Sequence, residues 1–159
     1  MRTPRFDPAP LEGDARFTRD RASGLVYNRA QSRVLYADTD RSDIVYHANY
    51  LRYFEFGRAN LMRDVGFPYA QVEASGYVYP IFDLAVQYFQ PLRYDDPFFV
   101  YTRTGDIDRV RIRFDYVLTH AETGCLVCRG HTRHCALNPK GVVVGVDPIT
   151  VATWQNFPR

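Results

Sequence analysis

The sequence has 159 residues, of which 46% are hydrophobic and 24% are charged. This length fits one compact domain with a single core. Twenty Lys and Arg against 18 Asp and Glu leave a net charge of +2, which excludes the large basic excess of a general nucleic-acid-binding domain. Three cysteines argue against a disulfide framework, and no apolar run approaches the roughly 20 residues of a membrane span. We therefore expect a cytoplasmic protein without a signal peptide.

The first 24 residues predict an N-terminal tail. They contain three prolines, Gly13 and many charged side chains, and their apolar residues follow neither a helical nor a strand period. Such a segment is either disordered or packs as an extended arm on a partner subunit. The single domain is expected to span residues 25–159.

One long helix is predicted after residue 49. Apolar or small residues recur there at spacings of three and four, which places on one helical face Tyr50, Phe54, Gly57, Leu61 and Val65. Asn49 is the expected N-cap, and Gly66 followed by Pro68 is a stop signal. Because Gly57 costs about 1 kcal/mol relative to Ala inside a helix, we expect the helix to approach a sheet closely at that point.

The remaining chain is rich in strand-like runs, at residues 25–38, 78–89, 98–104, 110–119 and 126–137. Residues 148–157 predict a short closing helix or strand. One long helix and an antiparallel meander of about five strands form an α+β architecture. A single helix covers only one face of such a sheet and leaves its edge strands unpaired, which favours dimerisation through the sheet.

Two short segments before the helix carry a resemblance to a known family. Residues 36–40 read Tyr-Ala-Asp-Thr-Asp and residues 44–50 read Ile-Val-Tyr-His-Ala-Asn-Tyr, while residues 91–96 form a Pro-Leu-Arg-Tyr-Asp-Asp turn. Over roughly residues 33–140 the sequence resembles the 4-hydroxybenzoyl-CoA thioesterase family, and most closely its branch associated with the bacterial Tol–Pal system. The resemblance implies a hotdog fold, in which an antiparallel sheet wraps one long helix, and assembly into homodimers or homotetramers.

The resemblance also implies an activity, the hydrolysis of an acyl- or aroyl-CoA thioester to the free acid and coenzyme A. Asp40 corresponds to the catalytic carboxylate of the family, which acts as nucleophile or general base. Either route needs a donor for the developing oxyanion, and a helix N-terminus supplies one. By resemblance this donor is the backbone N–H of His47, and the imidazole of His47 orients the substrate or protonates the thiolate. No cofactor is expected, since coenzyme A is part of the substrate.

Five further residues are expected to bind the substrate. Tyr46, Asn49 and Tyr50 adjoin the motif, whereas Arg109 and Arg111 alternate along one face of a predicted strand. By resemblance the start of that strand lies near the coenzyme phosphates, which guanidinium groups bind well. The acyl group itself is left open by the sequence.

Three acidic side chains near the motif have simpler interpretations. Asp43 stands where the family usually has glycine; Asp tolerates left-handed backbone, so the turn can form, and its charge can raise the pKa of a neighbouring carboxyl. Asp38 is expected to be a turn former. Glu55 is expected to form a solvated ion pair with Arg58, three residues later.

The run Cys125-x2-Cys128-x2-His131-x2-His134 has the spacing of metal ligands. It falls in a predicted strand, where residues three apart point to opposite faces. Cys125 and His131 then share one face, while Cys128 and His134 share the other. Because four such ligands cannot converge on one ion, we expect no metal site.

Two alternative functions stay open. A hotdog enoyl-CoA hydratase or dehydratase would use Asp40 and His47 as an acid–base pair, although the sequence lacks the Gly-Asp-x-Asn-Pro-x-His step of such hydratases. A non-catalytic acyl-CoA-binding protein would keep the fold and lose turnover. Release of free thiol distinguishes a thioesterase from both.

Overall fold

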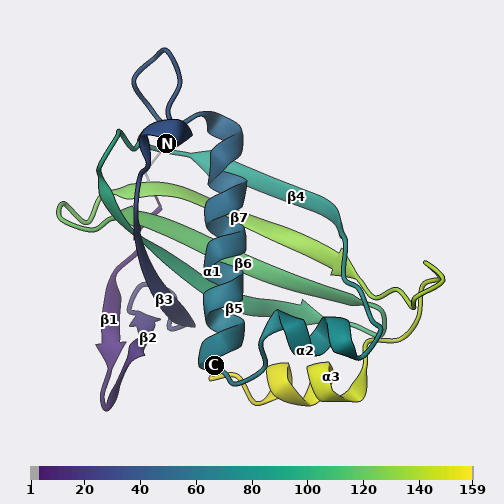
Figure 1. The fold of residues 1–159 in the computed structure, drawn as a ribbon. Helices are drawn as coiled ribbons and strands as arrows, with labels where there is room; N and C mark the ends of the chain where they lie inside the picture. The colour runs from purple at the N-terminus through teal and green to yellow at the C-terminus, as the bar shows by residue number, and fades with distance from the viewer. Residues whose placement is uncertain (1–3, 159) are drawn as a thin grey trace.

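The computed structural model describes residues 4–158, which form one antiparallel sheet curved around a long helix (Figure 1). The seven strands of these residues are β1 (Pro8–Leu11), β2 (Asp14–Asp20), β3 (Val26–Arg33), β4 (Ile81–Tyr88), β5 (Pro97–Ile107), β6 (Arg111–His120) and β7 (Leu126–Cys135). Their order is β1-β2-β3-β5-β6-β7-β4. Helix α1 (Tyr50–Asp64) crosses one face of the sheet, and α2 (Tyr69–Ala74) and α3 (Pro148–Gln155) lie toward its C-terminal end (Figure 1).

The N-terminal segment differs from the predicted tail. Strands β1 and β2 form a hairpin, and β2 pairs with β3, which extends the sheet to seven strands instead of about five. Four of the seven residues of β2 are charged, so the sequence carries little strand signal there. Upstream of the hairpin, the ring of Phe6 meets the rings of Tyr27 and Tyr101 edge-on, at centroid distances of 5.5 and 4.8 Å. Residues 1–3 of the predicted tail lie outside the described range.

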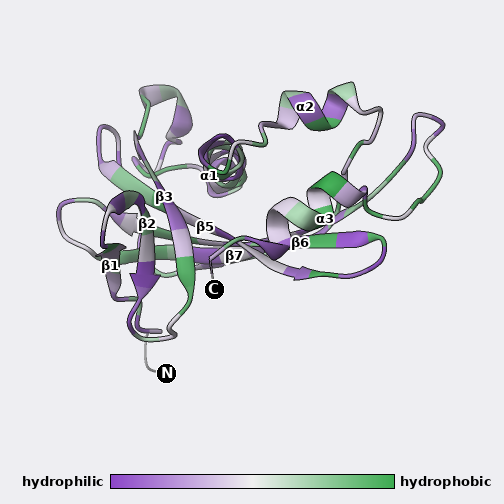
Figure 2. Ribbon diagram, turned by 90° about the horizontal axis from the view of Figure 1, so that it is seen from below, coloured by the Kyte–Doolittle hydropathy of each residue, from purple (hydrophilic) through white to green (hydrophobic). Residues whose placement is uncertain are grey.

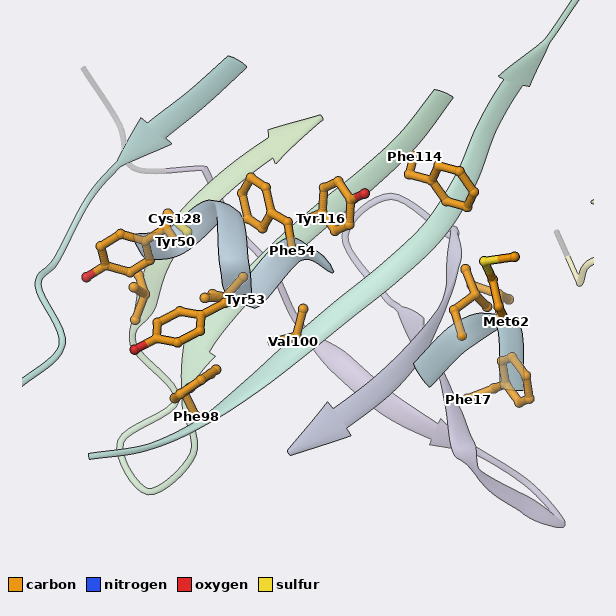
Figure 3. Packing of buried hydrophobic residues seen from close by; sticks show 14 of the residues in the cluster. Phe17, Tyr50, Tyr53, Phe54, Met62, Phe98, Val100, Phe114, Tyr116 and Cys128 are labelled. Atoms are coloured by element: carbon orange, nitrogen blue, oxygen red, sulfur yellow. The ribbon is translucent and has the colours of Figure 1, made fainter. Parts of the chain in front are cut away.

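The predicted apolar face of α1 packs on the sheet. Phe54 and Leu61 are fully buried, and the ring of Phe54 stacks on that of Tyr116 in β6 at 4.3 Å, with 4° between the ring planes (Figure 3). Aromatic pairs of this kind contribute about 0.5–1.5 kcal/mol beyond the area that they bury. The main hydrophobic core therefore lies between α1 and the strands β5, β6 and β7.

Gly57 sits where α1 closely approaches β5. A Cβ atom at this position would lie 2.5 Å from the Thr102 hydroxyl oxygen and would overlap the side chain of Val100. The close approach expected from the sequence is confirmed, and it explains why the helix accepts a residue of low helix propensity.

The closing segment forms a helix, α3, rather than a strand. The side chain of Asp147 caps it by accepting a hydrogen bond from the backbone N–H of Thr150 at 2.9 Å. Trp154 of α3 is buried against Phe114 of β6, with ring centroids 5.7 Å apart. Helix α3 thus covers the end of the sheet that α1 leaves open (Figure 2).

The outer face of the sheet, opposite α1, is rich in ion pairs. Arg113 and Arg103 contact the carboxylate of Asp115 at 2.9 and 3.4 Å, and His131 contacts Asp83 at 3.2 Å. His134 instead lies buried on the side of α1, so the predicted separation of these two histidines onto opposite faces is confirmed. No helix within residues 4–158 is long and apolar enough to cross a membrane.

Candidate active site

The loop that precedes α1 folds back on itself. The N–H of Asp40 donates to the carbonyl of Ile44 at 3.0 Å, and the N–H of Tyr46 donates to the carbonyl of Asp38 at 2.9 Å. A turn closes the tip, where the N–H of Asp43 donates to the carbonyl of Asp40 at 3.1 Å. Asp43 has φ of 61°, so it adopts the left-handed conformation expected at a position where the family has glycine.

Asp40 presents a carboxylate to solvent at this loop. Its side chain is exposed, and its Oδ1 accepts a hydrogen bond from the backbone N–H of Ser42 at 2.7 Å. Within residues 4–158, its Oδ2 accepts no hydrogen bond. The loop therefore holds one carboxylate oxygen in place and leaves the other available to attack a carbonyl or to accept a proton.

Asp38 has a structural environment. It is 3% exposed and accepts hydrogen bonds from the Tyr53 hydroxyl at 2.8 Å, from Arg52 at 3.2 Å and from the backbone N–H of Leu35 at 3.0 Å. Burial, and then the hydrogen bond to this carboxylate, raise the pKa of Tyr53. Asp38 therefore anchors the loop to α1, and its carboxylate does not share the exposed surroundings of Asp40.

A 3-10 turn, His47–Asn49, leads from the loop into α1. Its first residue is exposed, and among the described residues the backbone N–H of His47 has no acceptor. The carbonyl of His47 accepts a hydrogen bond from the hydroxyl of Tyr88 in β4 at 2.6 Å, and the rings of Tyr46 and His47 lie 4.4 Å apart. An unengaged N–H at the positive end of a helix is a suitable donor to an oxyanion.

Two residues of the motif turn away from solvent. Asn49 does not cap α1 through its side chain; its Nδ2 donates to the carbonyl of Asp38 at 2.9 Å. Tyr50 is 3% exposed, its hydroxyl accepts a hydrogen bond from the N–H of Leu92 at 3.2 Å, and burial raises its pKa to about 12. We therefore leave Tyr50 out of the substrate site proposed below, because the core surrounds it.

Arg109 and Arg111 lie at the opposite end of the sheet. Tyr88, at one end of β4, contacts the turn of His47, whereas Ile81, at the other end, pairs with His134 beside the start of β6. A strand of eight residues spans about 26 Å, so one chain does not bring these arginines to Asp40. The guanidinium of Arg111 lies 5.6 Å from the ring centroid of Phe82 on β4.

The predicted ion pair between Glu55 and Arg58 does not form. Arg58 turns inward and donates from Nη1 to the Tyr116 hydroxyl at 2.9 Å, while Glu55 stays exposed. Spacing along the helix brought the two residues close, but the interior beneath α1 determines where the long arginine side chain points.

A curved antiparallel sheet around one long helix defines the hotdog class of protein. Solved structures confirm the fold: DHNA-CoA thioesterase from Staphylococcus aureus superposes with a TM-score of 0.77, is 27% identical, and matches over 81% of this chain and 89% of that chain. The predicted hotdog architecture is therefore confirmed, with seven strands in place of about five.

Sequence comparison assigns the family. The model of the thioesterase-like superfamily matches residues 34–144. A putative esterase from Aquifex aeolicus is 32% identical over 122 residues, which are 77% of this chain and 91% of that protein. The putative acyl-CoA thioesterase YneP from Bacillus subtilis is 37% identical over 89 residues, 56% of this chain and 64% of that protein. The chain belongs to the thioesterase-like superfamily, and the predicted enzyme class, thioester hydrolase, is confirmed. Membership of the Tol–Pal-associated branch stays a prediction.

Proposed function

We propose that this protein hydrolyses an acyl- or aroyl-CoA thioester, with Asp40 as the catalytic carboxylate and the His47 N–H as the oxyanion donor. The observation that carries the proposal is the presence of both groups on the loop that leads into α1, one with an unengaged carboxylate oxygen and the other with an unengaged N–H. Family membership supplies the reaction class, and these two groups supply the chemistry that it requires.

Two routes use the same groups. In the first, Oδ2 of Asp40 attacks the thioester carbonyl to give a mixed anhydride, which a water then hydrolyses to the free acid and the Asp40 carboxylate. In the second, Oδ2 takes a proton from a water that attacks the carbonyl itself. In both routes the carbon–sulfur bond breaks and the thiolate leaves with its electron pair, then takes up a proton, for which the exposed imidazole of His47 is the nearby donor. The His47 N–H stabilises the negative charge on the carbonyl oxygen.

The protein acts as a homodimer in this proposal, joined through β4. This edge strand is exposed along nearly its whole length and carries large apolar side chains, Ile81, Phe82, Leu84 and Tyr88, each between 43% and 49% exposed. A long apolar edge is a template for pairing with another strand. Two copies of β4, paired antiparallel about a two-fold axis, continue the sheet from one subunit into the next.

That dimer would also explain how Arg109 and Arg111, which lie far from Asp40 in one subunit, can bind the same substrate. Antiparallel pairing places the Ile81 end of one β4 against the Tyr88 end of the other, and therefore brings the partner subunit's Arg111 toward the loop of Asp40. Two strand spacings, about 10 Å, separate β4 from β6. Arg109 and Arg111 of one subunit would then bind the coenzyme phosphates of the substrate held at Asp40 in the other. A homotetramer, built from two such dimers, is the alternative assembly.

A thiol-release assay over short, long and aromatic acyl-CoAs tests the proposal, with Asp40→Asn as the variant. We expect kcat to fall by about 10²–10⁴-fold, the usual contribution of a positioned base. Asp43→Asn is the matched control in the same loop, because Asn also tolerates left-handed backbone and should keep activity. Wild-type activity in Asp40→Asn would refute the assignment. Tight binding without thiol release would favour the non-catalytic alternative, and hydration of an enoyl-CoA would favour the hydratase.

A single-turnover reaction in heavy-oxygen water distinguishes the two chemical routes. Label in the Asp40 peptide indicates the mixed anhydride, whereas its absence there indicates an activated water.

A cytoplasmic location is also a proposal, supported by the three unpaired cysteines of the described chain, which suit a reducing compartment.

A further inference from the structure

A small cavity lies under the C-terminal half of α1, away from the loop of Asp40. Its volume is about 60 Å³, and it is lined by residues of α1, α2, α3, β6 and β7 on the face of the sheet that α1 covers. Arg58 is eight residues after the start of α1, about 12 Å along the helix axis. The lining combines apolar and aromatic side chains with two nitrogen-bearing groups: Met62, Phe67, Phe114, Trp154, Arg58 and His134.

Arg58 brings a positive charge to this cavity without a counter-charge. Its side chain is half-buried, and its one hydrogen bond within residues 4–158 goes to the Tyr116 hydroxyl at 2.9 Å. In the same part of the chain, no carboxylate oxygen lies within 4.0 Å of its guanidinium. Because the side chain is only half-buried, its remaining N–H groups are open to solvent or to a ligand.

The hydrogen-bond network beyond Arg58 contains no carboxylate, and its groups are hydrogen-bonded to one another. The backbone carbonyl of Tyr79 lies 2.9 Å from Nδ1 of His134, so that nitrogen carries the proton and Nε2 is the acceptor. Nε2 accepts from Thr132 Oγ1 at 2.8 Å, which in turn accepts from the Tyr116 hydroxyl at 2.7 Å. Each side chain of this network, from Tyr116 through Thr132 to His134, already has a hydrogen-bond partner. The guanidinium has five N–H donors, and one of them is used.

His134 does not add a charge to this network. Burial, and to a lesser extent the charge of Arg58, lower the pKa of His134 to about 4, so it is neutral near pH 7. The cavity lining includes no carboxylate, and Asp147, which precedes α3, is already engaged: it accepts from the Tyr79 hydroxyl at 2.7 Å and from the N–H of Thr150 at 2.9 Å. Among the described residues, the charge of Arg58 therefore has no carboxylate partner.

We propose that this cavity is a binding site for a small organic anion, a carboxylate of two or three carbons. The carboxylate would accept hydrogen bonds from the remaining N–H groups of Arg58, and the alkyl end would contact the aromatic side chains of Phe114 and Trp154. A water needs about 10–15 Å³ of such space, so 60 Å³ holds roughly four or five non-hydrogen atoms, the size of acetate or propionate. The site is independent of catalysis at Asp40.

Propionate binding can be measured on the full-length protein by thermal unfolding. Sodium propionate should raise Tm relative to sodium chloride at the same ionic strength, and 1-propanol, which has a similar alkyl chain and no charge, should not. At about five times its Kd, propionate should raise Tm by roughly 2–4 °C. Trp154 is the one tryptophan of the chain and lines the cavity, so its fluorescence should change along the same titration.

Two variants test the role of the charge. Arg58→Met removes the charge at similar length and should abolish both responses, whereas Arg58→Lys keeps a cation and should retain a smaller response. Arg63→Met, on the exposed side of the same helix, should respond as the wild type does. The proposal is wrong if chloride stabilises the protein as much as propionate does, if the wild type shows neither response, or if Arg58→Met keeps them. The wild-type comparison of salts decides the question even where a variant does not fold.

Discussion

Replacing Gly57 by Ala tests whether the packing of α1 on the sheet outweighs local helix preference. In an isolated helix, Ala is favoured over Gly by about 1 kcal/mol. Here the new Cβ would lie 2.5 Å from Thr102 Oγ1 and would overlap the side chain of Val100. Val100 is fully buried and β-branched, so it has little freedom to turn aside.

The expected result follows from these two opposing contributions. Overpacking of a tight core costs about 1–3 kcal/mol, and two overlaps, one with Val100 and one with Thr102, place Gly57→Ala near the upper end of that range. After the gain in helix propensity, the free energy of unfolding should fall by about 2 kcal/mol, and Tm should fall by roughly 4–8 °C.

Urea unfolding and calorimetry measure this change, and a second substitution identifies its cause. Val100→Ala opens space opposite Gly57, so Gly57→Ala should be less destabilising in a Val100→Ala background than in the wild type; a double-mutant cycle gives the coupling directly. A Gly57→Ala protein that is more stable than the wild type, or a coupling of zero, would show that α1 does not approach β5 as described.

Three further predictions concern other parts of the molecule. The pKa of His134 is lowered to about 4 from 6.5, so between these pH values the unfolded state binds more protons than the folded state. The free energy of unfolding, measured in urea, should therefore fall by about 2 kcal/mol from pH 7 to pH 5. Equal stability at both pH values would contradict the buried, neutral imidazole. Phe6→Ala removes the ring that contacts Tyr27 and Tyr101 and should cost about 1–2 kcal/mol in the same assay, whereas a change within 0.3 kcal/mol would mean that this segment does not pack on the sheet. Leu84→Lys places a charge on the exposed edge strand and should yield monomers in sedimentation experiments; an unchanged dimer would locate the subunit interface elsewhere.

The local features of this protein are determined by its sequence alone. The stripe from Tyr50 to Val65 predicts α1 because helical periodicity is a property of neighbouring residues, and Gly57 within it predicts the close approach to the sheet. The left-handed turn at Asp43 is expected from the family resemblance, because the family usually has glycine there, and the conformational tolerance of Asp permits it. The order of the acidic loop, the histidine step and the helix likewise predicts the family, because these features are contiguous in the chain.

Orientation and long-range partners depend on the tertiary structure. Asp38 turns inward because Arg52 and Tyr53, more than a dozen residues later, provide its donors, and Arg58 turns away from Glu55 because the Tyr116 hydroxyl lies beneath α1. The charged strand β2, with its hairpin partner β1, joins the sheet because β3 offers an edge to β2. For Arg58, the local ion pair is worth a few tenths of a kcal/mol, whereas a hydrogen bond to a charged group contributes about 1.5–3 kcal/mol, so the tertiary contact decides where the side chain points.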